Sequence, residues 1–402
     1  SPERRARAAA DLSDLAAAAG DLRSAALHLD AALALTPAHD AVERAERLRR
    51  RAEVDENRGD LSAARARLAE ARALVHGRAD EAARAVSITV RRDEAWLWYR
   101  DGQYDTAVAR LTELLDEVPP AAHALMGLVR NALGVVNYGR GDYETAALHY
   151  RRALVAKDAT GDEAGAASAC NNLGILAQKQ GDVRAAVGWY ERALRTYVKR
   201  GDRAGLARAY NNLGALYGEV GDYGKAAKYL EESIRIRHRA GHGGVALGYA
   251  NLGEVRLKEG RLEEARAHLE KAIALCREGR GPGYLLPDAW RMLAELHVQL
   301  DDATAAGEAA LEALTLARDC GDRPREGVAL RVLGEACDQA GELETAGDWI
   351  DQAIDVLEEL EQPLELGRAY AARARHLERL GDAGATTAQA QADALLAAVR
   401  ST

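Results

Sequence analysis

Small and apolar residues recur along this 402-residue chain at helical spacing, in segments that end at a glycine or at a glycine–aspartate pair. Apolar positions three and four residues apart predict amphipathic helices, and a glycine after such a segment is typical of a helix C-terminus. The turn signal returns every 39 to 43 residues and accounts for the whole chain. Its ten positions are Gly20, Gly59, Gly102, Gly141, Gly181, Gly221, Gly260, Asp301, Gly341 and Gly381. We therefore predict ten units, each built as helix, tight turn, helix, tight turn.

Small residues also repeat at fixed distances from each turn residue. Alanine stands five residues after the turn in nine of the ten units, with Thr386 in the last. The residue seven before the turn is always alanine, glycine or serine. Small residues on two facing helices let the backbones approach, and large neighbours fill the space beside them. The pattern predicts that the two helices of a unit pack tightly. It also predicts a left-handed glycine at the turn, with the following aspartate capping the next helix.

Two successive units show a longer motif, in which a large residue, Leu-Gly, alanine and another large residue follow at constant spacing. Its residues are Cys170, Leu173, Gly174, Ala186 and Tyr190 in one unit, and Tyr210, Leu213, Gly214, Ala226 and Leu230 in the next. This order resembles the tetratricopeptide repeat (TPR) family. The resemblance covers all ten units, more weakly in the first three and the eighth. The 40-residue period is similar to repeats of kinesin light chains, spindle-orientation adaptors and bacterial signalling proteins.

The resemblance implies an all-α fold, a right-handed α-solenoid superhelix of about ten helix-turn-helix repeats, with a concave groove lined by the first helix of each repeat. We expect residues 1–402 to form a single solenoid. The expected repeats are approximately 1–40, 41–79, 80–121, 122–161, 162–201, 202–240, 241–281, 282–321, 322–361 and 362–402. The last repeat is the most polar, with Asp393 in place of a recurring alanine, as expected for a helix that caps the stack.

Asparagines repeat on the predicted first helices of the middle units, where tight packing does not explain them. Asparagine is a poor interior residue of a helix, because its side chain competes for backbone hydrogen bonds. Its amide both donates and accepts, so it can pair with the backbone of an extended peptide. The motif A-x-x-x-N-N-L-G resembles the one that serves this purpose in kinesin-light-chain-type repeats. In the alternative interpretation these amides bond neighbouring helices, and Asn172, Asn212 and Asn251 fit that alternative better.

Residues ten, six, three and two before the turn share the inner face of a first helix. The predicted peptide-binding groove consists of Asn131, Tyr138, Asn171, Gln178, Lys179, Arg208, Asn211, Asn172, Asn212, Asn251 and Glu254. Early inner positions are basic, as at Arg92 and Arg100, whereas later ones are acidic, as at Glu295 and Glu335. We expect the acidic part of a partner to lie near the early units.

Composition narrows the functional class. The net charge of −9 argues against sequence-independent binding of nucleic acid, and no apolar run is long enough to span a membrane. We expect a cytoplasmic protein whose four cysteines are buried and reduced. Neither H-E-x-x-H nor G-x-S-x-G occurs. His238 and His242 are four residues apart, but Gly241 should end their helix. We therefore expect no enzymatic activity, no cofactor and no metal.

We predict an interaction module that binds an extended peptide or protein segment in its groove, within a larger bacterial signalling or regulatory protein. A first alternative is a ligand- or signal-peptide-sensing module of a transcriptional regulator or STAND-type ATPase. It would need a pocket, for which the aromatic cluster at Trp96 and the nearby Tyr138 are candidates. A second alternative is an accessory array attached to a catalytic domain outside this chain. The sequence names neither the partner nor the oligomeric state.

Overall fold

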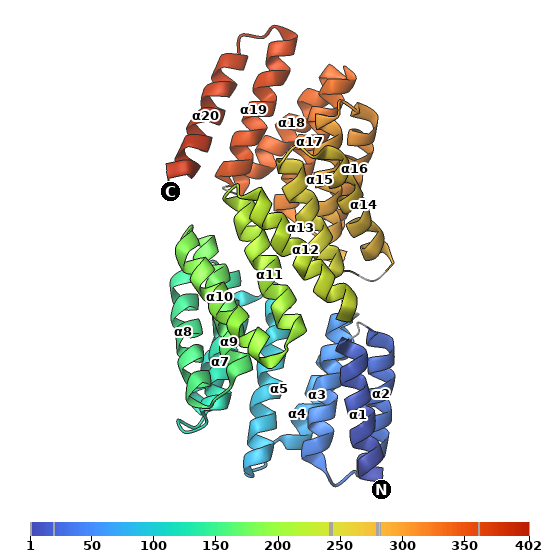
Figure 1. Cartoon of the computed structure of the whole chain (residues 1–402), viewed down its shortest axis with the longest axis vertical. Coiled ribbons are helices and arrows are strands. Elements are labelled where there is room, and N and C mark those ends of the chain that lie inside the picture. The colour runs from blue at the N-terminus through green and yellow to red at the C-terminus, as the bar shows by residue number, and fades with distance from the viewer. Residues whose placement is uncertain are drawn as a thin grey trace. The chain divides into compact units, whose positions relative to one another are not determined.

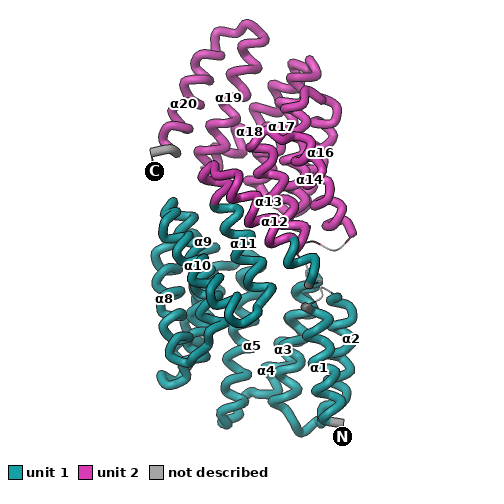
Figure 2. The backbone as a smooth tube through the Cα atoms, in the orientation of Figure 1, with its two compact units in different colours: residues 1–216, 235–243 teal, residues 217–234, 244–402 magenta. Residues whose placement is uncertain are grey.

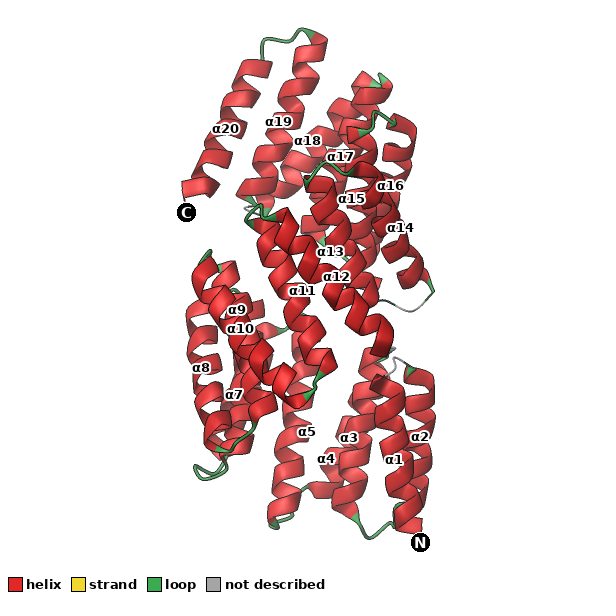
Figure 3. Ribbon diagram, viewed as in Figure 1, coloured by secondary structure: helices red, strands yellow, loops and turns green. Residues whose placement is uncertain are grey.

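The computed structural model describes residues 2–18, 21–240, 244–278, 281, 283–360 and 362–401. These residues form α-helices and one short 3₁₀ helix, Gly283–Leu285, with no strand among them (Figures 1 and 3). The helices are α1 Pro2–Ala18, α2 Leu22–Leu35, α3 Ala41–Asn57, α4 Leu61–Val75, α5 Glu81–Arg100, α6 Tyr104–Glu117, α7 His123–Gly139, α8 Tyr143–Ala159, α9 Glu163–Lys179, α10 Val183–Arg200, α11 Arg203–Glu219, α12 Tyr223–Ala240, α13 Val245–Lys258, α14 Leu262–Arg277, α15 Leu286–Gln299, α16 Ala303–Asp319, α17 Arg323–Ala340, α18 Leu343–Glu359, α19 Pro363–Leu380 and α20 Ala385–Ser401.

The chain divides into two compact units (Figure 2). The first unit holds residues 1–216 and 235–243, and the second holds residues 217–234 and 244–402. We call the odd-numbered helices first helices and the even-numbered ones second helices. Each consecutive pair, from α1–α2 to α19–α20, falls within one of the ten expected repeat ranges. That all ten repeats form a single solenoid domain stays a prediction.

The turn residues adopt the predicted conformation. Every turn glycine that the structure describes has a positive φ, and so does Asp301, with φ 59°. Gly20 lies outside the described residues, as do Gly241 and His242. An aspartate after the turn caps the next helix in most repeats, as where Asp182 accepts a hydrogen bond from the backbone N–H of Ala185 at 2.9 Å. The left-handed C-terminus is therefore confirmed at the described turns. The aspartate N-cap is confirmed in most repeats, but Gln103, Arg261 and Glu342 take that position without a side-chain cap.

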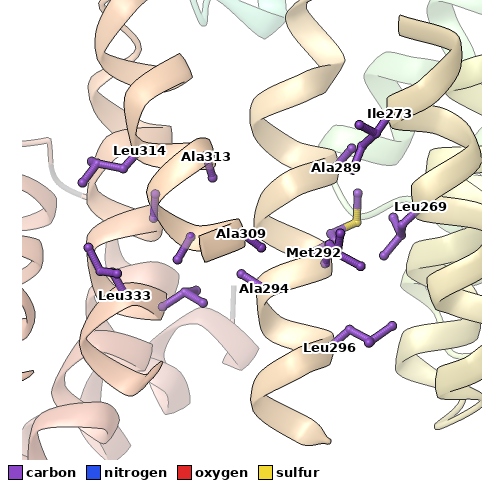
Figure 4. Packing of buried hydrophobic residues seen from close by; sticks show 14 of the residues in the cluster. Leu269, Ile273, Ala289, Met292, Ala294, Leu296, Ala309, Ala313, Leu314 and Leu333 are labelled. Atoms are coloured by element: carbon purple, nitrogen blue, oxygen red, sulfur yellow. The ribbon is translucent and has the colours of Figure 1, made fainter. Parts of the chain in front are cut away.

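The two helices of a repeat pack through the small residues that the sequence singles out. The alanine five residues after the turn is completely buried in all nine units that carry it. Seven residues before the turn, a Cβ built on Gly174 would lie 2.5 Å from the ring of Tyr190, and one on Gly134 would lie 2.5 Å from the ring of Tyr150. In the second unit Ala294 of α15 faces Ala309 of α16 in the same way (Figure 4). The predicted close approach is confirmed.

One prediction about the cysteines is wrong. All four are free thiols. Cys170 and Cys276 are buried as expected, and Cys337 is half-buried. Cys320, however, is exposed, because it follows the last residue of α16 as its C-cap, beyond the buried stripe of that helix.

The all-α repeat fold predicted from the sequence is confirmed by these helix pairs and by the structural comparisons reported below. Among the described residues, no helix combines the length and apolar character needed to cross a bilayer.

Candidate functional site

Within each unit the first helices lie against one another as well as against their own second helices. α3, α5, α7 and α9 are in successive contact in the first unit, and α13, α15, α17 and α19 in the second. Hydrogen bonds join neighbouring first helices. The indole N–H of Trp96 donates to Glu56 Oε1 at 2.7 Å, and the amide of Gln339 donates to the carbonyl of Val298 at 2.8 Å. Each unit thus presents a wall of first helices that side-chain bonds hold together.

The asparagines belong to this set of cross-repeat bonds. Asn172 Nδ2 donates to Asn131 Oδ1 at 3.1 Å, and Asn212 Nδ2 donates to Asn171 Oδ1 at 3.0 Å. Asn171 and Asn211 are only 3% and 5% exposed. Little of either amide could reach a ligand, which favours the alternative interpretation in which they set the repeat geometry. The groove role of Asn171 and Asn211 stays a prediction, which their burial does not favour.

Two other predicted groove residues of the first unit pack against their own repeat. Tyr138 is half-buried, with its ring centroid 5.6 Å from that of Tyr143. Gln178 accepts a hydrogen bond from the hydroxyl of Tyr190 at 2.9 Å. Both side chains therefore help to join a first helix to its second helix.

The charged candidates are more accessible. Lys179 is exposed at the end of α9, and Arg208 is exposed on α11, where it donates to the hydroxyl of Tyr197 at 3.3 Å. Glu254 is half-buried on α13 beside Asn251 and forms an ion pair with Lys258 at 2.8 Å. The groove role of Lys179, Arg208, Asn131 and Glu254 stays a prediction.

The first unit contains a pocket of about 300 Å³ on α3, α5 and α7. Trp96 and Asn131 line it together with the charged residues Arg49, Glu53 and Arg92, whereas Tyr138 does not. Burial raises the pKa of Glu53, against the lowering effect of Arg49. The pocket therefore combines an aromatic ring, an amide and charged groups.

A larger cavity, of about 820 Å³, lies on the first-helix wall of the second unit. Residues six, three and two before the turn contribute to it, as the inner-face pattern predicts. Its lining residues are Glu219, Glu254, Leu257, Lys258, Asp288, Arg291, Met292, Glu295, Val298, Gln299, Pro324, Arg325, Val328, Arg331, Glu335, Leu357, Gln362, Leu364, Glu365 and Arg368. We call this cavity the second-unit groove. Its wall alternates apolar side chains with ionic ones.

A buried arginine holds the centre of that wall. Arg331 of α17, 5% exposed, donates to Glu295 Oε1 of α15 at 2.8 Å and to Glu335 Oε2 at 3.0 Å. Glu365 Oε2 of α19 lies 4.0 Å from the same guanidinium. Burial would raise the pKa of Glu295, but Arg291 and Arg331 hold it below its ordinary value. The carboxylates in turn hold the pKa of Arg331 above its ordinary value. One cation therefore ties three first helices together.

The ion pairs of this wall reduce the negative charge that the sequence predicts for the later repeats. Glu295 and Glu335 pair with Arg331, and Asp338 accepts from Arg379 at 2.9 Å. The carboxylates that the sequence places in the late units are thus mostly neutralised within the wall. These paired carboxylates therefore do not support the expectation that the acidic part of a partner lies near the early units.

Sequence reasoning missed the arginines, although a signal for them was present. Arg291 and Arg331 stand ten residues before their turns, the register that Asn131 occupies in the middle units. The same inner position carries an amide in one stretch of repeats and a guanidinium in another. The rim of the second-unit groove carries three further cations, Lys258, Arg325 and Arg368, whose side chains are 42%, 36% and 48% exposed. They pair with Glu254, Asp288 and Glu365, respectively.

Comparison with known families agrees with the repeat pattern. Tetratricopeptide repeat models match residues 92–163, 131–197, 165–238 and 246–278. No curated protein matches the sequence.

Several solved structures share the fold at low identity. The apo form of the quorum sensor NprR from B. thuringiensis matches with a TM-score of 0.62 at 12% identity, covering 89% of this chain and 100% of that one. A signal-transduction ATPase with numerous domains and a tetratricopeptide repeat sensor, from Pyrococcus horikoshii, matches with a TM-score of 0.59 at 14% identity, covering 85% of this chain and 52% of that one. A Rap protein complexed with competence and sporulation factor matches with a TM-score of 0.56 at 15% identity, covering 85% and 98%. At these identities the likeness concerns the fold.

Proposed function

The chain belongs to the tetratricopeptide repeat family, and on that premise we propose that it binds an extended peptide or protein segment on the first-helix wall of its second unit. The observation that carries this proposal is the second-unit groove, a cavity of about 820 Å³ formed by α13, α15, α17 and α19 with contributions from α11 and α18. A volume of this size suits several side chains of a ligand rather than one small ion.

The chemistry of the groove suits a peptide. Met292, Val328 and Leu364 offer apolar contacts, and Leu364 is 41% exposed without a ligand. Arg325 pairs with Asp288 and Arg368 pairs with Glu365, but both side chains are more than a third exposed, so their remaining N–H groups can donate to backbone carbonyls or to an acidic side chain. A ligand with alternating apolar and acidic positions would use both kinds of contact. Because Arg331 and its carboxylates are bonded to one another, we assign them to the rigidity of the wall rather than to ligand contact.

We also propose a sensing or regulatory role for the chain. Proteins of similar fold include a quorum sensor and an ATPase with a repeat sensor, which supports a sensing or regulatory role in a bacterial cytoplasm. We propose no enzymatic activity for the chain and no nucleic-acid or membrane partner.

A second candidate is the binding of a small molecule in the first-unit pocket, where Trp96 and Asn131 meet. A thermal-shift screen with single metabolites separates the two functions. Stabilisation that a Trp96→Ala variant loses would assign the ligand to that pocket instead of the second-unit groove.

The peptide proposal predicts that groove variants lose ligand. We would select binders from a displayed library of random peptides and measure their affinity by calorimetry. The double variant Leu364→Glu, Arg368→Glu should weaken selected peptides at least about tenfold, because it removes an apolar contact and reverses a charge. The control is Leu311→Glu, a change at a leucine that is 54% exposed on α16 and lies outside the groove. Equal affinity of both variants for every selected peptide would contradict the proposal.

A further inference from the structure

A pocket of about 340 Å³ lies in the first unit, where α5 packs against both α4 and α6. Trp98 lines it, whereas Trp96 lines the first-unit pocket described above, so the two cavities lie on different sides of α5. Its lining residues are Arg65, Arg72, Arg91, Glu94, Ala95, Leu97, Trp98 and Arg110. We call it the arginine pocket, because arginines make up half of this lining. The peptide proposal does not involve it.

Two of its arginines are held in place by the protein itself. Arg91 bonds to the carboxylate of Glu117 through both of its terminal nitrogens, with Nη2 donating at 2.8 Å. The guanidinium of Arg65 lies over the ring of Trp98, 4.9 Å from the ring centroid, and pairs with Asp101. Because these two cations are already ordered, a ligand that contacts them loses little free energy in immobilising them.

The other two arginines are held only weakly. Arg72 donates to Glu94 at 3.3 Å, and Arg110 donates to Glu113 at the same distance. The side chains of the two arginines are 54% and 64% exposed. Exposed ion pairs of this kind contribute little to stability. A guanidinium also carries five N–H donors, of which such a bond engages one. An incoming anion can therefore share these donors without breaking the fold.

The charges inside the pocket are unbalanced. Burial raises the pKa of Glu94, whereas the positive charges of Arg72, Arg91 and Arg110 lower it. One carboxylate therefore faces three guanidinium groups. The carboxylates that pair with the other arginines are not among the lining residues. A hollow whose wall carries an excess of one charge concentrates ions of the opposite sign, so the arginine pocket favours an anion.

We propose that the arginine pocket binds the diphosphate group of a small molecule. The planar fork of arginine matches the oxygens of a phosphate group and bonds them in pairs. A volume of about 340 Å³ falls in the range of small-molecule sites. Arg72 of α4 and Arg110 of α6 come from the two helices that flank α5, so a ligand with two linked phosphates reaches both. Leu97 and Trp98 offer apolar surface beside them.

Isothermal titration calorimetry of the full chain at low ionic strength tests the site, with pyrophosphate and inorganic phosphate as probes. Pyrophosphate should bind at least about tenfold more tightly than phosphate, because it carries more charge and bridges more guanidinium groups. Added salt should weaken the binding. ADP is titrated alongside. Tighter binding of ADP than of pyrophosphate assigns the site to an esterified diphosphate, and weaker binding assigns it to the free ion.

Single variants locate the binding in the pocket. Arg72→Gln and Arg110→Gln should each weaken pyrophosphate at least about fivefold, because each removes a cation from the lining. The matched control is Arg84→Gln, the same change at an exposed arginine of α5 outside the pocket, which should leave the affinity unchanged. Glu94→Gln should strengthen binding at least about threefold, because it removes the negative charge from the lining. Circular dichroism verifies that each variant keeps its helices.

The same titrations can overturn the proposal. They do so if pyrophosphate does not bind at millimolar concentration, or if it binds no more tightly than phosphate. Equal losses for Arg72→Gln and Arg84→Gln would place the binding elsewhere on the chain. A Glu94→Gln variant that binds pyrophosphate more weakly than the wild type would contradict the assignment of the lining to an anion.

Discussion

Replacing Arg331 by methionine should destabilise the second unit by about 3–5 kcal/mol, the usual cost of removing one partner from a buried ionic cluster. The variant leaves Glu295 and Glu335 without the guanidinium that both bond at 3.0 Å or less. Methionine fills most of the volume, so the loss is electrostatic rather than a cavity effect. Urea unfolding, followed by circular dichroism, measures the change.

Two further variants test the electrostatic cause. Arg375→Met removes an exposed arginine that also pairs with Glu335, at 2.6 Å, and should cost less than about 1 kcal/mol. Adding Glu295→Gln and Glu335→Gln to Arg331→Met should recover much of the stability, because the two carboxylates that bonded Arg331 are then replaced by neutral amides. A small effect of Arg331→Met, or a triple variant less stable than the single one, would contradict this role of Arg331.

The pairing of Glu295 with Arg291 and Arg331 makes the stability of this cluster depend on pH. The pKa of Glu295 in the folded protein is below the ordinary value, so the cluster stabilises the fold above the pKa of an unfolded glutamate. That contribution is lost as the pH falls through the lowered folded pKa. In the Arg331→Met variant, the free energy of unfolding should therefore fall less than in the wild type as the pH is lowered.

Gly174→Val should destabilise the first unit by about 3 kcal/mol, because even a Cβ at this position would lie 2.5 Å from the ring of Tyr190. The ring cannot move away, since Tyr190 is completely buried. The two backbones would have to separate, and the contact between α9 and α10 would open. Thermal and urea unfolding report the loss.

The matched control lies on the partner helix. Gly188 of α10 is exposed, and a Cβ built on it meets nothing within 4 Å. Gly188→Val should therefore be neutral or slightly stabilising, by a few tenths of a kcal/mol, since valine is a better helix former than glycine. If Gly174→Val and Gly188→Val lowered the free energy of unfolding equally, the loss at Gly174 could not be attributed to its close contact with Tyr190.

Local sequence pattern predicted the helix pairs well, because the determinants are local. A glycine at a turn and an alanine five residues later act within one repeat, and both behave as expected, with Asp301 taking the left-handed turn in place of glycine. The partner of Gly174 could also be anticipated, since Tyr190 belongs to the same motif.

The side-chain bonds between first helices could not be predicted from the local pattern. They join residues about 40 apart, such as Asn131 with Asn172 and Glu295 with Arg331. Whether such side chains face a ligand or each other depends on the stacking of whole repeats, which no local pattern specifies. The asparagines were therefore open to two interpretations, and in the structure Asn172 bonds to Asn131 and Asn212 bonds to Asn171. The arginine at the same register in the later repeats passed unnoticed, because the repeated residue type had changed.

The most direct test of the central claim is amide hydrogen exchange of the full chain with and without a library-selected peptide. The account predicts slower exchange on the peptide-facing first helices α13, α15, α17 and α19, with little change on the second helices α14, α16 and α18. Protection confined to the second helices, or to the first unit, would contradict it.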